Sequence, residues 1–369
     1  MDRPDDILLT TPISKICLYF DSQFAIFDNT DYFTTVNRGT FAIEESSRLR
    51  GSYLASSSLQ LLDAECNFNA CDARDRHLYY AYYDAATRKT TVAIMGGRLV
   101  TDTAKSCFMV WNDAEHVFEK QAIVVKRMMQ MRDSGSVEIL TDEGLALYHI
   151  KDIKASTDTM VEPRSAIAVV DASQCIQAFD WYVGGDGYYV VLTAKGMIQY
   201  VRLSSKATFS IAFTAQMVEG LKSNAVFSAI ACPRCRSPPL VVAGFDVDRR
   251  ANMMIVLDDK GDRLSKLNDI SNDDGLPIVE MRAYHDNELD VTYIVSWSIR
   301  SVYFHCLDVK HRLTPIFDRL MDGMQINGVI VMYVPGRHIT LTVYGKKDTR
   351  GDIVRMKLEW NTDEIRMLN

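Results

Sequence analysis

The chain has 369 residues, of which 47% are hydrophobic and 24% charged, and its net charge is −7. These proportions are those of a folded globular protein, and no segment is polar or repetitive enough to predict disorder. A net negative charge excludes a protein whose whole surface is given to nucleic acid, since such binding depends on neutralising phosphates.

The amino terminus opens with acids and a proline, whereas a secretory signal needs a basic start and an unbroken apolar run. No window approaches the roughly twenty apolar residues of a membrane span. The eight cysteines lie mostly in apolar strand patterns, as buried thiols do in a reducing compartment. We expect an intracellular protein, cytoplasmic or nuclear, without a membrane partner.

Pairs of short strands around a charged turn recur along most of the chain. Their residues alternate or run in β-branched and aromatic groups, and the breaks fall at turn residues. The turns recur about every 50 residues, which is the length of a four-stranded propeller blade with its loops. The six predicted pairs are 77–84 with 91–95, 137–140 with 145–150, 188–192 with 197–203, 240–245 with 253–257, 291–297 with 302–307, and 339–344 with 353–358.

Further strands flank these pairs. We place them at 107–111, 124–129, 177–181, 209–213, 278–284 and 326–333, which gives four strands per copy. Residues 15–20, 24–27 and 40–43 supply strands for a seventh copy, and residues 7–10 can complete the last one. Free sheet edges invite pairing with other chains, so we predict radial closure. The two best candidates for short helices are 215–221 and 315–321.

The predicted fold class is therefore all-β, a single β-propeller domain over residues 1–369. Seven four-stranded blades are expected, with the amino-terminal segment closing the last blade. The strand beginning at Gly196 and the segment Gly351 to Asn361 resemble the glycine, hydrophobic strand and Trp-Asp ending of WD repeats. The Gly-His and Trp-Asp dipeptides of that family are otherwise missing, and with them its internal polar network. The resemblance implies a WD40-like propeller without a family-specific partner.

Cys232-Pro-Arg-Cys235 is the sharpest local motif, because two thiolates at this spacing can bind one zinc ion. A structural zinc site needs four ligands, and Cys66 and Cys71 are loosely spaced and distant in sequence. Two unliganded thiols in a loop are the favoured interpretation, so we predict no metal and no cofactor. His149 and His305 fall in strand patterns, where we expect hydrogen-bonded structural histidines.

The segment Ser271 to Gly275 is similar to the Asp-box of sialidase-like propellers, but it occurs once and Ile278 stands where that motif has an aromatic residue. A polar turn explains it better. No nucleophile elbow, phosphate-binding glycine loop or dinucleotide fingerprint is present. We therefore predict a protein that is not an enzyme, with a glycoside-acting propeller enzyme as the alternative.

Basic residues occupy the turn of nearly every strand pair, with Asp142-Glu143 as the exception. In a propeller these turns emerge on one face, so the sequence predicts a locally basic surface on an acidic protein. Charges in exposed turns are also common where they are merely solvated. The candidate binding residues are Arg88, Lys89, Lys195, Arg249, Arg250, Arg300, Lys346, Lys347 and Arg350.

Such a surface could dock an acidic protein segment or a phosphopeptide. We predict a non-catalytic interaction scaffold, a subunit of a larger intracellular complex whose partners are other protein subunits. A nucleic-acid-binding propeller is a second alternative, which a continuous basic groove with exposed aromatics would favour.

Overall fold

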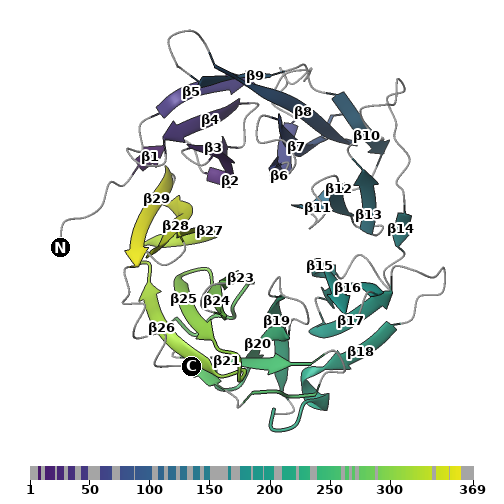
Figure 1. Ribbon diagram of the computed structural model, residues 1–369, viewed down its shortest axis with the longest axis vertical. Helices are drawn as coiled ribbons and strands as arrows, with labels where there is room; N and C mark the ends of the chain where they lie inside the picture. Colours follow the sequence, from purple (N-terminus) through teal and green to yellow (C-terminus); the bar gives the residue numbers. More distant parts are fainter. Residues whose placement is uncertain are drawn as a thin grey trace. The chain divides into compact units, whose positions relative to one another are not determined.

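In the computed structural model of Figure 1, the described residues lie mostly in strands. Besides the strands named below, the structure describes residues 85–86, 88, 195–196, 215–221, 224, 232, 239, 247–250, 258, 262–265, 274–279, 290, 298–300, 308–312, 321–323 and 348. Side-chain burial is described for 62, 81, 83, 85–86 and 88, and for most residues from 190 to 351. None of the helices in this described part is long and apolar enough to cross a membrane.

By its contacts the chain divides into two compact units, one of residues 9–173 and one of residues 1–8 with 174–369. We call them the N-terminal unit and the C-terminal unit. That residues 1–369 form one domain stays a prediction.

Among the described residues, the N-terminal unit contains three sheets whose strands follow one another in sequence. Their strands are β2 (Ile13–Phe20), β3 (Gln23–Asp28), β4 (Tyr32–Asn37) and β5 (Ile43–Arg48); β6 (Leu59–Phe68), β7 (Asp75–Asp84), β8 (Lys89–Thr101), β9 (Cys107–Trp111) and β10 (Glu115–Gln121); and β11 (Val125–Gln130), β12 (Ser136–Thr141), β13 (Leu145–His149) and β14 (Ser165–Ile167).

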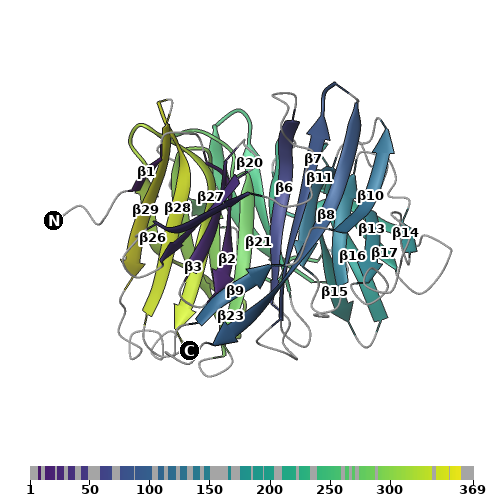
Figure 2. The ribbon, with the colours of Figure 1, turned by 90° about the horizontal axis from the view of Figure 1, so that it is seen from above.

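One of these sheets departs from the predicted four strands, because β8 pairs with two strands, β9 and β10, on the side opposite β7 (Figure 2). Residues 89–94 of β8 pair with β10, and residues 97–101 pair with β9. At 13 residues, β8 is longer than either partner, so the two short strands share its edge.

The described part of the C-terminal unit contains four sheets. Their strands are β15 (Cys175–Val183), β16 (Asp186–Thr193), β17 (Met197–Arg202) and β18 (Ser210–Thr214); β19 (Ala225–Ala231), β20 (Leu240–Asp246), β21 (Ala251–Leu257) and β22 (Asn268–Ile270); β23 (Glu280–Asp286), β24 (Val291–Trp297), β25 (Ser301–Leu307) and β26 (Leu313–Leu320); and β27 (Met324–Val334), β28 (His338–Lys347), β29 (Arg350–Leu358) and β1 (Ile7–Leu9).

The strand order β27, β28, β29, β1 places the amino-terminal strand beside β29, where the sequence predicted that it would pair. The predicted central strand pairs are likewise confirmed as neighbours within their sheets. The number of blades and the closing of the ring stay predictions.

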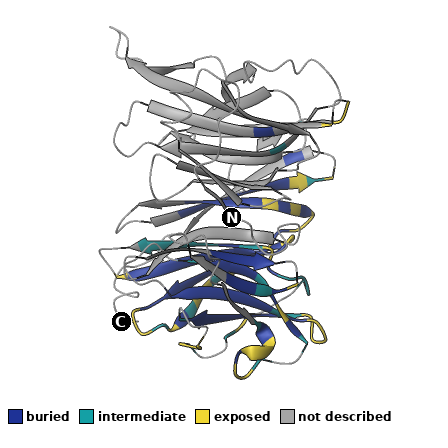
Figure 3. Cartoon of the chain, turned by 90° about the vertical axis from the view of Figure 1, so that its right-hand side faces the viewer, coloured by how far each residue is buried: buried dark blue, intermediate teal, exposed yellow. Residues whose placement is uncertain are grey.

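Apolar clusters join successive sheets of the C-terminal unit. Every residue of β24 and β25 is buried, which explains their nearly continuous apolar sequences. One side of this strand pair packs Trp297 and Phe304 against Val329 and Leu341 of the next sheet. The other side packs Tyr303 and Ile294 against small residues of the preceding sheet, among them Ala229, Ala231 and Ala243. In Figure 3 the described strands are mostly buried, whereas exposed residues gather at strand ends and turns.

Neither of the two predicted helices forms over its full length. Residues 215–221 contain only a three-residue 3-10 helix, Ala215–Met217. The prediction for 315–321 was wrong, because these residues belong mainly to β26. Phe304 pairs with Phe317 and His305 with Pro315, so Ile316 is an extra residue in the strand. This bulge disrupts the alternation and leaves apolar residues three to four apart, which imitates a helix.

Candidate docking surface

The strand register places two kinds of loop at the same edge of each sheet in the C-terminal unit. This edge, which we call the tip edge, carries the hairpin between the second and third strands. The connection from each sheet to the next lies there as well, because the strand before it ends and the strand after it begins at this edge. The register pairs that show this are Met197 with Thr214, Ala225 with Asp246, Asn252 with Ile270, Glu280 with Trp297, Ser301 with Leu320, and Met324 with Lys347.

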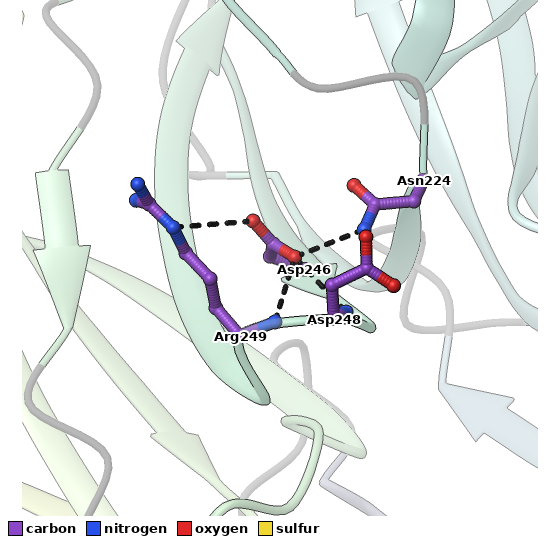
Figure 4. Close-up of polar contacts among 4 residues, drawn as sticks. All are labelled: Asn224, Asp246, Asp248 and Arg249. Atoms are coloured by element: carbon purple, nitrogen blue, oxygen red, sulfur yellow. Dashed lines mark hydrogen bonds and ion pairs between the residues drawn. The ribbon is translucent and has the colours of Figure 1, made fainter.

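A buried carboxylate organises the hairpin between β20 and β21 (Figure 4). Asp246 is 1% exposed, and its Oδ1 accepts hydrogen bonds from the backbone N–H of Asp248 at 3.1 Å and of Arg249 at 3.0 Å. The same oxygen accepts a 3.2 Å bond from Nδ2 of Asn224, in the connection from the preceding sheet. Arg250 completes the turn with a φ of 52°, in the left-handed region. The side chain that ends β20 therefore sets the shape of the turn.

Hydroxyl side chains occupy the same place in the neighbouring sheets. Thr193 ends β16, and its Oγ1 accepts a 3.2 Å bond from the N–H of Met197. Ser298 follows β24, and its Oγ accepts the N–H groups of Arg300 at 3.1 Å and Ser301 at 2.8 Å. Short polar side chains that bond the backbone a few residues ahead are typical turn-forming groups. Three successive hairpins thus share one capping arrangement.

Polar contacts also tie the connections to these hairpins. Asp274, in the connection from β22 to β23, accepts a hydrogen bond from Ser298 Oγ and one from the Leu276 N–H at 3.0 Å. Asn252 donates to the Leu276 carbonyl at 2.7 Å and accepts from the Ile278 N–H at 3.0 Å. The chain therefore forms a polar network at this edge although its sequence lacks the Gly-His and Trp-Asp dipeptides.

Backbone bonds fix the next connection in the same way. The N–H of Met321 donates to the Arg300 carbonyl at 2.7 Å, and the N–H of Ile326 donates to the Ile299 carbonyl at 2.7 Å. A Cβ built on Gly323 would lie 3.9 Å from Cε of Lys347. The hairpin that carries Arg300 and the one that carries Lys347 are therefore neighbours through this connection.

The predicted basic residues fall into two groups. Lys195, Arg249, Arg250, Arg300 and Lys346 are exposed at the tip edge, and Lys347 is half-buried there. Arg249 Nε lies 4.0 Å from Asp246 Oδ2, which ties its side chain to the cap. Arg350 begins β29, but its side chain lies outside the described residues. Arg88 is exposed and Lys89 begins β8, both in the N-terminal unit, so they are described apart from the others.

Sequence reasoning missed the apolar part of this surface. Val247 is 51% exposed and Ile299 is 39% exposed, each directly after a capping residue. Three more exposed apolar side chains lie at strand ends of the tip edge: Val226, Val279 and Leu320. Exposed acids are present as well, namely Asp248, Asp322 and Asp348. The tip edge is therefore a mixed surface, and its basic excess is smaller than the hairpin sequences alone suggest.

The other sequence candidates behave as structural groups where they are described. Cys232 is half-buried, whereas Cys235 lies outside the described residues. Within the described part of the chain, no cluster of three or more histidine, cysteine or acidic residues could hold a metal ion. Gly275 has a φ of 61° beside the bonded Asp274, so the end of the Asp-box-like segment is a polar turn.

The expectation for His305 is only partly met. It is buried in β25, but its Nδ1 finds no hydrogen-bond partner among the described residues. Burial lowers the pKa of His305 to about 4. The side chain of His149 lies outside the described residues.

Comparison with known proteins identifies the fold. No protein-family description and no curated protein matches the sequence. Among solved structures, U3-55K matches with a TM-score of 0.57 and 10% identity, covering 95% of this chain and 98% of that one. The WD40 repeats of RRP9 match with a TM-score of 0.55, 10% identity and the same coverage of 95% and 98%.

The protein has the fold of a β-propeller. More particularly, it is a WD40-like propeller, as the repeat pattern in its sequence predicted. At this identity the likeness concerns the fold alone, so the function has to be argued from the surface.

Proposed function

We propose that this protein is a non-catalytic scaffold, a single propeller that serves as a subunit of an intracellular complex in the cytoplasm or nucleus. It docks an acidic or phosphorylated segment of another protein on its tip edge. The observation that carries the proposal is the repeated capped hairpin: Thr193, Asp246 and Ser298 hold successive turns in place, and exposed basic side chains follow each cap. Turns held in this way lose little conformational entropy when a partner binds.

The basic side chains supply charge complementarity. Lys195, Arg300 and Lys346 are exposed, and each such contact contributes at most about 1 kcal/mol to binding and weakens as salt is added. Together the three contribute up to about 3 kcal/mol, or roughly a hundredfold in Kd at low salt. Affinity therefore comes from several contacts on one partner segment.

The direct test uses synthetic peptides of about a dozen residues, either acidic, phosphorylated or neutral, titrated into the full chain at low and physiological salt. We expect the acidic and phosphorylated peptides to bind and the neutral ones not. The variant K195E/R300E/K346E should lose binding by roughly a hundredfold. Equal binding of acidic and neutral peptides, or full binding by this variant, would contradict the proposal.

The β23–β26 sheet offers a matched control. Arg300 precedes β25 at the tip edge, and Lys310 lies in the turn after β25 at the opposite edge; both are exposed. Arg300→Glu and Lys310→Glu change the net charge equally, so a general charge effect would weaken both. We expect only Arg300→Glu to weaken peptide binding.

The role as a complex subunit is tested by a separate experiment. In an extract of cells that make the protein, size fractionation should place it well above the monomer position, and the triple variant should shift toward that position. A wild-type protein found entirely as monomer would contradict the subunit role.

A further inference from the structure

We propose that the docked segment carries apolar side chains between its acidic ones, and that Val247 and Ile299 receive them. This inference rests on the proposed docking function and specifies its partner as an extended, amphipathic protein segment. The partner is recognised by two kinds of contact, basic side chains for its acids and aliphatic tips for its apolar residues.

The position of the two aliphatic side chains is the first argument. Val247 follows the cap Asp246, and Ile299 follows the cap Ser298, so they occupy equivalent places in successive hairpins. Val247 is 51% exposed and Ile299 is 39% exposed. Hairpin turns favour polar residues and glycine, and the cap already fixes the turn. Folding therefore gives no reason for a β-branched apolar residue at either position.

Further exposed apolar residues adjoin these hairpins. The N–H of Val279 donates to the Trp297 carbonyl at the base of the hairpin that carries Ile299. Leu320 pairs with Ser301 at the other side of the same hairpin. Val226 lies in β19, and a Cβ built on Gly196 would be 3.3 Å from the Val226 Cβ. Exposed apolar residues therefore accompany the basic residues in two successive sheets, β19–β22 and β23–β26.

The composition of this surface favours a protein segment over a nucleic acid. Asp248, Asp322 and Asp348 are exposed among the basic residues and interrupt the positive charge. A phosphate backbone carries a charge at every nucleotide and would meet these acids, whereas a protein segment can place its acids beside the basic side chains alone. Single-stranded nucleic acids are bound largely by stacking on aromatic side chains. The exposed large hydrophobic side chains in the described part of the chain are aliphatic or methionine, so they offer no stacking platform.

The spacing of the sheets sets the pattern of the partner. Packed sheets lie about 10 Å apart, and an extended chain advances roughly 3.3 Å per residue. Successive hairpins therefore meet side chains about three residues apart on the partner. A segment that follows the four tip hairpins needs about ten residues, with an apolar and an acidic residue in each group of three.

The test compares two ten-residue peptides of equal negative charge, one with leucine in every group of three and one with serine in its place. Calorimetric titrations are made with the wild-type chain and with V247S/I299S, while K195E/R300E/K346E separates the charge contribution. We expect the leucine peptide to bind the wild type more tightly by at least about tenfold, with a negative heat-capacity change. V247S/I299S should abolish that preference and leave the serine peptide unaffected.

The outcomes distinguish the two proposals. If the two peptides bind the wild type equally while the charge variant loses binding, docking depends on charge alone and this inference fails. If V247S/I299S retains the leucine preference, other side chains receive the apolar residues and the inference fails as well. If neither peptide binds, the proposed docking function fails with it. A ten-nucleotide single-stranded RNA that binds more tightly than the leucine peptide and competes with it would also overturn the inference. Thermal unfolding confirms that V247S/I299S is folded, as its exposed positions predict.

Discussion

Removal of the carboxylate that caps the β20–β21 hairpin should destabilise the protein measurably. Asp246 is buried and accepts two backbone hydrogen bonds, from Asp248 and Arg249, and one from the Asn224 amide. Hydrogen bonds to a charged group contribute about 1.5 to 3 kcal/mol each. Water can replace part of this in Asp246→Ala, since the Arg249 side chain is 64% exposed. We therefore expect the free energy of unfolding to fall by about 3 kcal/mol.

Urea unfolding followed by circular dichroism measures this loss, with two companion variants as controls. Asp246→Asn keeps an oxygen that can accept both backbone bonds, so it should lose only about 1 kcal/mol. Asp248→Ala removes an exposed carboxylate from the same turn and should change stability by less than about 0.5 kcal/mol. If Asp246→Ala were no less stable than Asp248→Ala, the capping account of the hairpins would be wrong.

Three further outcomes are expected. Gly345→Ala would place its Cβ against the backbone carbonyl of Gln325, so urea unfolding should show a loss of about 3 kcal/mol or more; near-wild-type stability would refute the close approach. Burial lowers the pKa of His305 from 6.5 to about 4. Between these pH values the unfolded chain therefore binds a proton at His305 that the folded chain does not bind. The free energy of unfolding should therefore fall by about 3 kcal/mol as the pH drops from 6.5 to 4, and the same pH series on His305→Leu should lack this component. Metal analysis should find no stoichiometric zinc in the wild-type chain or in the double variant with Cys232→Ser and Cys235→Ser; one zinc per chain, lost in the double variant, would contradict this.

The central strands were predictable because their burial leaves a direct mark on the sequence. Runs such as 291–297 and 302–307 are nearly all apolar, and they correspond to β24 and β25, which are buried throughout. The outer strands have a weaker signature. β26 is mostly exposed and contains Pro315 and the Ile316 bulge, so its apolar residues follow no period of two. Six strands were missed altogether, namely β4, β6, β10, β14, β19 and β22.

The candidate site was predictable only in its basic residues, because charge in a turn can be read directly. The caps could not be recognised with the same ease, since an aspartate before a turn is usually exposed and Asp246 is buried. A signal existed, because a short polar residue ends an apolar strand in each of three copies. The exposure of Val247 and Ile299 could not be read from the sequence, since apolar residues beside strands are normally assigned to the core.

The capped hairpins separate two tasks that compete in most loops. Backbone geometry is determined by an inward side chain at the end of a strand, so the outward positions are released from any part in folding. Natural variation or laboratory evolution can therefore exchange Val247, Ile299 or Arg300 for other chemistry at little cost in stability. The same framework could then be retargeted from one ligand to another by a handful of point changes.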